Sequence, residues 1–110
     1  MTRYDKLVRD RIPEIIEADG KQCVTRVLDQ GEFDLRLGEK LQEEMAEYQQ
    51  TGEVTELADL VEVIQALVES HGMTWAEFET LRTRKRIERG GFARRLLLCE
   101  VQSDPETRSV

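Results

Sequence analysis

Aromatic residues, cysteine, proline and histidine are all scarce in this chain. Aromatics make up 5% of its 110 residues, and it has two cysteines, two prolines and one histidine. Two cysteines are too few for a disulfide framework, and Cys23 and Cys99 lack the paired spacing of a zinc finger. We therefore expect both to be reduced thiols in the core or in strands. His71 lies at a helix end and belongs to no motif, so we interpret it as a cap or surface residue.

Long apolar runs and excess positive charge are absent as well. No stretch approaches the roughly 20 apolar residues that a membrane-spanning helix needs. The first ten residues, MTRYDKLVRD, lack the apolar region of a secretory signal. The formal net charge of −7 opposes general attraction to nucleic acid. We expect a cytoplasmic protein with neither a membrane nor a nucleic-acid partner.

The residues that are abundant favour one mainly helical domain. Hydrophobic residues make up 39% of the chain and charged residues 35%, which excludes collagen-like and low-complexity proteins. Leu, Glu, Arg and Ala, all good helix formers, are frequent, and a chain of this length can bury one core. We predict a domain over residues 1–101 and a disordered polar tail over 102–110.

Capping signals mark the ends of four expected helices. A short helix follows Asp10, an expected N-cap, and ends at Asp19-Gly20. Longer helices are expected over about 32–50, over about 54–70, and from Thr74 to about Arg89. The supporting signals are Asp29 with Glu32, Thr51-Gly52, His71-Gly72, Thr74 with Glu77, and Gly90-Gly91.

Two further segments are predicted to be strands. Residues 22–28, QCVTRVL, alternate in polarity and include β-branched side chains. Residues 93–101, ARRLLLCEV, have the length of a strand that could pair with the first segment. The expected fold class is therefore mainly α, an antiparallel helical hairpin or bundle completed by oligomerisation, with a small two-stranded β piece.

Charge is unevenly distributed along the chain. Residues 39–69 hold nine acids and one base, Lys40, whereas residues 82–95 hold seven bases and one acid, Glu88. Solvated helix faces are one interpretation of such runs. The alternative is that the carboxylates hold cations and the bases hold a polyanion nearby.

Some of these acids do not fit a solvated face. On a helical wheel Glu44 falls inside the apolar stripe that contains Leu37 and Leu41. On the next helix Glu56 lies within the apolar arc and Asp59 lies beside it. An ionised carboxylate in apolar surroundings is costly unless it is paired or bound to a metal.

The spacing of the acids brings them together across the expected turn. Glu44 and Glu47 are three residues apart, and Glu56 and Asp59 repeat that interval. Glu47 and Glu56 are equally far from Thr51-Gly52, and so are Glu44 and Asp59, so the four acids can stack in two levels. Ligands that are all oxygen favour Mg²⁺ or Mn²⁺. A solvated acidic hairpin remains the alternative.

The combined motifs resemble the MazG-like, all-α nucleoside triphosphate pyrophosphohydrolases. The pattern EExxE at Glu43, Glu44 and Glu47 is followed by ExxD at Glu56 and Asp59. YDKLVRDRIPEIIEADG over 4–20 and KRIERGGFARR over 85–95 are similar to the ends of a short, phosphoribosyl-ATP pyrophosphohydrolase-like branch. Eight residues separate Glu47 from Glu56, a shorter spacer than is typical of the family.

The resemblance implies a Mg²⁺-dependent enzyme that cleaves nucleotides between the α- and β-phosphates. It implies that Glu44, Glu47, Glu56 and Asp59 are metal ligands and that Glu43 is an outer-shell group or a further ligand. Glu44 or Glu47 would act catalytically by orienting or deprotonating the attacking water. The basic side chains expected to bind phosphate are Lys6, Arg9, Lys85, Arg86 and Arg89.

Other functions stay open on the sequence alone. Phosphoribosyl-ATP is an alternative substrate, and a helical dimer module that binds nucleotide or metal without turnover is an alternative of another class. The helix over 54–70 has more apolar surface than one partner helix needs, which favours a homodimer or homotetramer.

Overall fold

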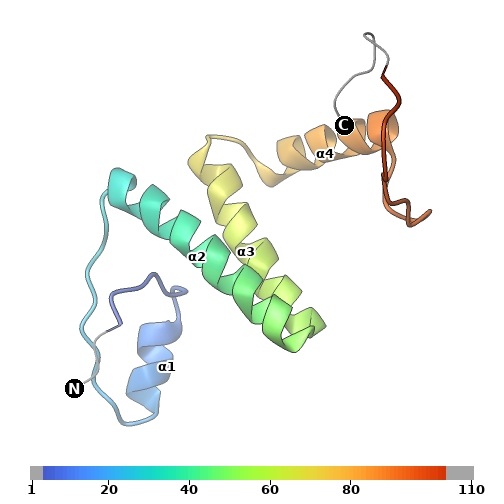
Figure 1. Cartoon of the computed structure of the whole chain (residues 1–110). Coiled ribbons are helices and arrows are strands. Elements are labelled where there is room, and N and C mark those ends of the chain that lie inside the picture. Colours follow the sequence, from blue (N-terminus) through green and yellow to red (C-terminus); the bar gives the residue numbers. More distant parts are fainter. Residues whose placement is uncertain (1–3, 104–110) are drawn as a thin grey trace. The chain divides into compact units, whose positions relative to one another are not determined.

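The computed structural model describes residues 4–103 (Figure 1). Within these residues the chain is all-α, with four helices and no strand. The helices are α1 (Ile12–Ala18), α2 (Gln30–Thr51), α3 (Val54–Ser70) and α4 (Trp75–Arg89). The chain divides into two compact units, Met1–Phe78 and Glu79–Val110. Of the predicted tail over 102–110, residues 102–103 are irregular and exposed, and residues 104–110 lie outside the described residues.

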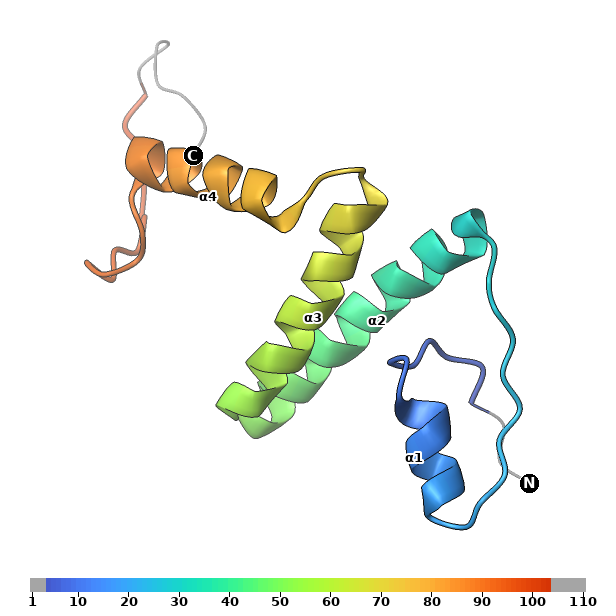
Figure 2. The ribbon, with the colours of Figure 1, turned by 180° about the vertical axis from the view of Figure 1, so that it is seen from behind.

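Helices α2 and α3 form the predicted antiparallel hairpin, and the two views in Figures 1 and 2 show them side by side. The Asp29 side chain caps α2 by accepting from the Glu32 backbone N–H at 2.9 Å. Gly52 ends α2 with φ of 67°, a left-handed conformation that glycine adopts without strain. The tight turn that follows brings the start of α3 beside the end of α2.

The hairpin has a small core. Among the described residues, the buried apolar side chains are Leu37 on α2 and Val63 and Val68 on α3. At the open end of the hairpin, Gln30 Nε2 donates to Ser70 Oγ at 3.2 Å, which joins the two helices by a polar contact. This packing fixes the face of α2 that meets α3.

Helix α4 begins and ends where the sequence predicts. The Glu77 N–H donates to Thr74 Oγ1 at 3.2 Å, and the Thr74 hydroxyl donates to the Glu77 carboxylate at 3.1 Å, so the predicted capping box is formed. Gly90, with φ of 84°, follows the last residue of the helix. His71 is the C-cap of α3 and is exposed, as predicted.

The prediction of a two-stranded β piece is wrong. Residues 22–28 and 93–101 are irregular, and the side chains of Val24 and Val27 are almost fully exposed. An isolated pair of strands is only marginally stable unless it packs against an apolar surface. A sequence that alternates in polarity does not by itself provide that surface. Cys23 is half-buried and Cys99 is exposed, so neither thiol lies in a core or a strand.

The predicted cap of α1 is also wrong by one residue. Arg11 rather than Asp10 is the N-cap, and no side chain caps this helix. The Ile12 N–H donates to the Arg9 carbonyl at 3.0 Å. This backbone turn gives the N–H the hydrogen-bond acceptor that a capping side chain would otherwise provide. None of the described helices has the length and apolar character needed to span a membrane.

Candidate metal centre

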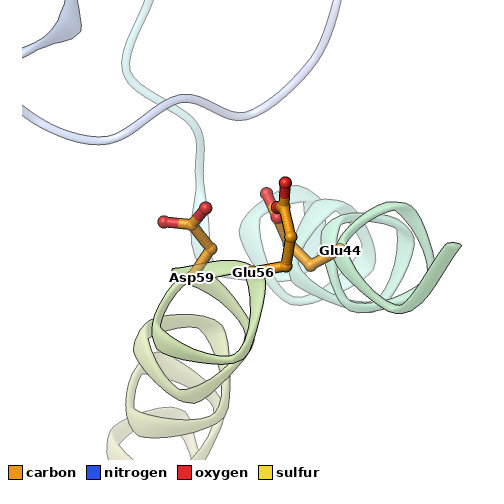
Figure 3. A group of neighbouring side chains, drawn as sticks. All are labelled: Glu44, Glu56 and Asp59. Atoms are coloured by element: carbon orange, nitrogen blue, oxygen red, sulfur yellow. The ribbon is translucent and has the colours of Figure 1, made fainter. Parts of the chain in front are cut away.

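Three carboxylates from the two helices of the hairpin meet at one place. Glu44 on α2 and Glu56 and Asp59 on α3 each offer an oxygen, and these oxygens all lie within 4.8 Å of one another. Figure 3 shows the three side chains leaving their helices on the same side. We call Glu44, Glu56 and Asp59 the acidic triad.

Glu44 is the buried member of the triad. Its wheel position between Leu37 and Leu41 faces α3, so the packing that buries Leu37 also draws Glu44 into the interface. Glu44 is 7% exposed. Its Oε1 lies 3.5 Å from Lys40 Nζ, whereas its buried Oε2 has no hydrogen-bond partner. A buried carboxylate oxygen without a partner is costly, and a cation bound to it would remove that cost.

Burial and the repulsion of nearby carboxylates make two members of the triad, Glu44 and Glu56, hard to ionise. Burial, followed by the charge of Glu47, raises the pKa of Glu44 above its ordinary value. The pKa of Glu56 is raised by removal from solvent and by the charges of Glu47 and Asp59. Keeping these groups anionic at neutral pH therefore opposes folding in the absence of a compensating cation.

Glu47 is a neighbour of the triad rather than a member of it. It lies one turn beyond Glu44 on α2 and is half-buried. Its carboxylate acts on both Glu44 and Glu56, as the raised pKa of each shows. The predicted two-level stack is therefore modified, because Glu44 meets both α3 acids while Glu47 stands beside them.

Glu43 is engaged by two lysines. Lys6 Nζ lies 3.3 Å and Lys40 Nζ 3.4 Å from its carboxylate oxygens. Partial burial opposes ionisation of Glu43, but the hydrogen bond from Lys6 and the charge of Lys40 outweigh it and lower the pKa. Because these ammonium groups already neutralise Glu43, its expected part in metal binding is that of an outer group.

Lys40 is a site residue outside the set that the sequence pattern predicts. It contacts both Glu43 and Glu44, and its side chain is 16% exposed. The signal was present, since Lys40 is the one base among nine acids and precedes Glu43 by three and Glu44 by four residues.

The predicted phosphate-binding bases fall into two groups. Lys6 and Arg9 contact acids of the hairpin. Lys6 pairs with Glu43, and Arg9 Nη2 donates to Asp59 Oδ1 at 2.9 Å. Lys85, Arg86 and Arg89 lie on α4 and are exposed. In the part of the chain that the structure describes, none of these three forms an ion pair. Their phosphate-binding role stays a prediction.

The donor set of the triad suits a hard divalent cation. All of its ligand atoms are carboxylate oxygens, which Mg²⁺ and Mn²⁺ prefer. Mg²⁺ usually keeps several waters and takes one or two carboxylates from the protein, so a cluster of three is sufficient. The unpartnered Oε2 of Glu44 is the atom that most requires a positive neighbour.

Comparison with known proteins gives a partial relative. A stretch of 42 residues is 52% identical to an uncharacterized protein of Mycolicibacterium smegmatis, and it covers 38% of this chain. The match spans 43% of that protein's length. No protein-family model and no solved structure matches the chain.

Proposed function

We propose that this chain is a Mg²⁺-dependent nucleotide pyrophosphohydrolase of the MazG-like type, which cleaves nucleoside triphosphates between the α- and β-phosphates. One observation carries the proposal. Three carboxylates from two antiparallel helices converge within 4.8 Å, and the buried one has an oxygen without a partner. The resemblance of the acidic motifs to that family supplies the reaction.

The triad and its neighbour have different roles in this proposal. Glu44, Glu56 and Asp59 would hold the cation, which would supply positive charge to phosphate oxygens and lower the pKa of a water bound to it. Glu47 lies beside the triad and is less buried than Glu44, so it is suited to accept the proton of the attacking water. Water oxygen bonds to the α-phosphorus, the bond from that phosphorus to the bridging oxygen breaks, and pyrophosphate leaves.

Phosphorus NMR of the full chain with Mg²⁺ and a panel of ribo- and deoxyribonucleoside triphosphates tests this function. The expected products are a nucleoside monophosphate and pyrophosphate. We expect Glu44→Gln to lower turnover at least about 100-fold, since removal of a group that orients a metal already costs 10–100-fold. Glu39→Gln is the matched control, because Glu39 is an exposed acid of α2 that pairs with Arg36.

Other products would contradict the proposal. A diphosphate and inorganic phosphate would place cleavage at the wrong bond. Absence of turnover on the panel and on phosphoribosyl-ATP, together with a Mg²⁺-dependent rise in thermal stability, would instead favour the non-catalytic binding module.

A further inference from the structure

The N-terminal segment Tyr4–Arg11 contacts the two helices of the hairpin at three places. Arg36 Nη1 on α2 donates to the Asp5 carbonyl at 3.3 Å. Lys6 then pairs with Glu43 of α2, and Arg9 pairs with Asp59 of α3. The segment therefore extends from one helix of the hairpin to the other.

One of the three contacts involves a member of the acidic triad, and the other two do not. Arg36 and Glu43 lie outside the acidic triad, so the contacts of Asp5 and Lys6 leave the triad free. Arg9 contacts a triad member directly, since its Nη2 lies 2.9 Å from Asp59 Oδ1. A cation bound by the triad and the Arg9 guanidinium would therefore compete for Asp59.

The Arg9–Asp59 pair is weak enough to be exchanged. The side chains are 54% and 44% exposed, so solvent screens the attraction. Exposed ion pairs change an equilibrium by about fivefold at most. A divalent cation carries twice the charge of Arg9 and also has carboxylate oxygens of Glu44 and Glu56 as ligands.

We propose that Arg9 pairs with Asp59 in the metal-free protein and is displaced when a divalent cation binds Asp59. The released Arg9 then binds the phosphate chain of the substrate. The guanidinium forms paired, charge-assisted hydrogen bonds with phosphate oxygens. Arg9 would therefore exchange the carboxylate of Asp59 for a phosphate of the substrate. Arg9 thus links metal loading to phosphate binding. This inference rests on the proposed function, because it takes the triad as the metal site.

Two binding measurements on the full chain test the exchange. With Mn²⁺ alone, monitored by the electron paramagnetic resonance signal of the free ion, Arg9→Ala is expected to bind about twofold to fivefold more tightly than the unaltered chain. With inorganic triphosphate and saturating Mg²⁺, monitored by calorimetry, the same variant is expected to bind about tenfold more weakly.

Arg11→Ala is the matched control, because Arg11 belongs to the same segment and pairs with Glu14. It should leave both affinities unchanged. Arg9→Gln keeps much of the side-chain length without the charge and should behave as Arg9→Ala does, which separates loss of charge from misfolding of the segment.

The outcomes distinguish the two proposals. If the unaltered chain binds Mn²⁺ but both Arg9 variants bind it equally or more weakly, the exchange is overturned and the metal centre stands. Unchanged affinity for triphosphate in both variants would also overturn the exchange. If the unaltered chain binds no Mn²⁺, the exchange and the proposed function fail together.

Discussion

Glu44 is the acidic side chain that is buried in the part of the chain that the structure describes. Its position results from the helical period, since a residue between Leu37 and Leu41 on the wheel must face α3 once Leu37 is buried. Its Oε2 lacks a partner, and Glu47 and Asp59 repel its charge. The residue therefore destabilises the metal-free fold, a cost typical of functional groups.

Replacement of Glu44 by glutamine should stabilise the metal-free protein. The amide removes the buried charge, while Lys40 keeps Glu43 as a partner. Each kcal/mol of relief raises the melting midpoint by about 4–8 °C in a domain of this size. The Mg²⁺-dependent rise in that midpoint should disappear. Thermal melts with EDTA and with Mg²⁺ measure both effects. A lower midpoint in EDTA would show that Glu44 stabilises the metal-free fold.

Acidification should also stabilise the metal-free protein at first. The pKa values of Glu44 and Glu56 are raised on folding, so the folded state takes up their protons before the unfolded state does. Stability should therefore rise as pH falls from 7 toward about 4.3, the ordinary pKa of glutamate. Melts in EDTA across this range measure the trend.

Below that range stability should fall. The pKa values of Glu32, Asp34 and Glu43 are lowered on folding, so their contribution is lost as pH falls through the folded values. Glu44→Gln is the control, because it should reduce the rise above the glutamate pKa, leaving the part due to Glu56, and keep the fall below it. A midpoint that decreases steadily from neutral pH would contradict the assignment.

At the scale of the elements, the ends of α2, α3 and α4 are determined by short-range chemistry. Asp29 and Thr74 cap their helices through groups three residues away, and Gly52 ends α2 in a left-handed conformation. These ends fix the turn, and the turn sets which residues of α3 can lie opposite Glu44.

Two glycine substitutions, one within α2 and one at its C-cap, should have opposite effects on stability. Gly52→Ala should destabilise the hairpin by about 1 kcal/mol, because a side chain is disfavoured at φ of 67°. Gly38→Ala should stabilise it by about 0.5–1 kcal/mol, since the residue is helical and an added Cβ meets nothing within 4 Å. Urea denaturation measures both. The same sign for both variants would contradict the proposed role of the turn.

The bases of α4 give a separate prediction at this scale. If Lys85, Arg86 and Arg89 bind phosphate, their combined replacement by alanine should raise KM for the nucleotide about tenfold or more. Steady-state kinetics measures the change. Arg82→Ala is the control, because Arg82 already pairs with Glu79 at 2.8 Å. An equal change in the control would indicate general loss of charge rather than a phosphate contact.

At the scale of the whole molecule, apolar surface exceeds what the described part of one chain covers. Val54 and Val61 on α3 are 75% and 46% exposed, and Leu35 and Met45 on α2 are 62% and 45% exposed. Exposed apolar surface of this kind is typical of interfaces. It supports the expectation that a second copy completes the helical bundle.

We predict that the chain is an oligomer whose association depends on α3. Val61→Glu should shift it to a monomer, because a charge within an apolar interface is costly. Sedimentation by analytical ultracentrifugation measures the mass. Thr55→Glu, on the same helix at an exposed polar position, should leave the mass unchanged. A monomeric unaltered chain at micromolar concentration would contradict the prediction.

The helices, and the acids that the hairpin brings near one another, were predictable from the order of residues. Helices depend on neighbours three and four residues away, so capping pairs and apolar periodicity are sufficient to locate them. The matched spacing around Thr51-Gly52 likewise follows from a local turn. The strand predictions over 22–28 and 93–101 failed because strand pairing requires partners distant in sequence.

Which side chains meet depends instead on how the helices and the N-terminal segment pack. The rotation of α2 against α3 places Glu44 with both Glu56 and Asp59 and leaves Glu47 beside them. The pairing of Arg9 with Asp59 joins residues 50 positions apart, which no helical period encodes. Contacts of this kind depend on how separate elements pack, because burial of Leu37, Val63 and Val68 fixes the faces that approach each other.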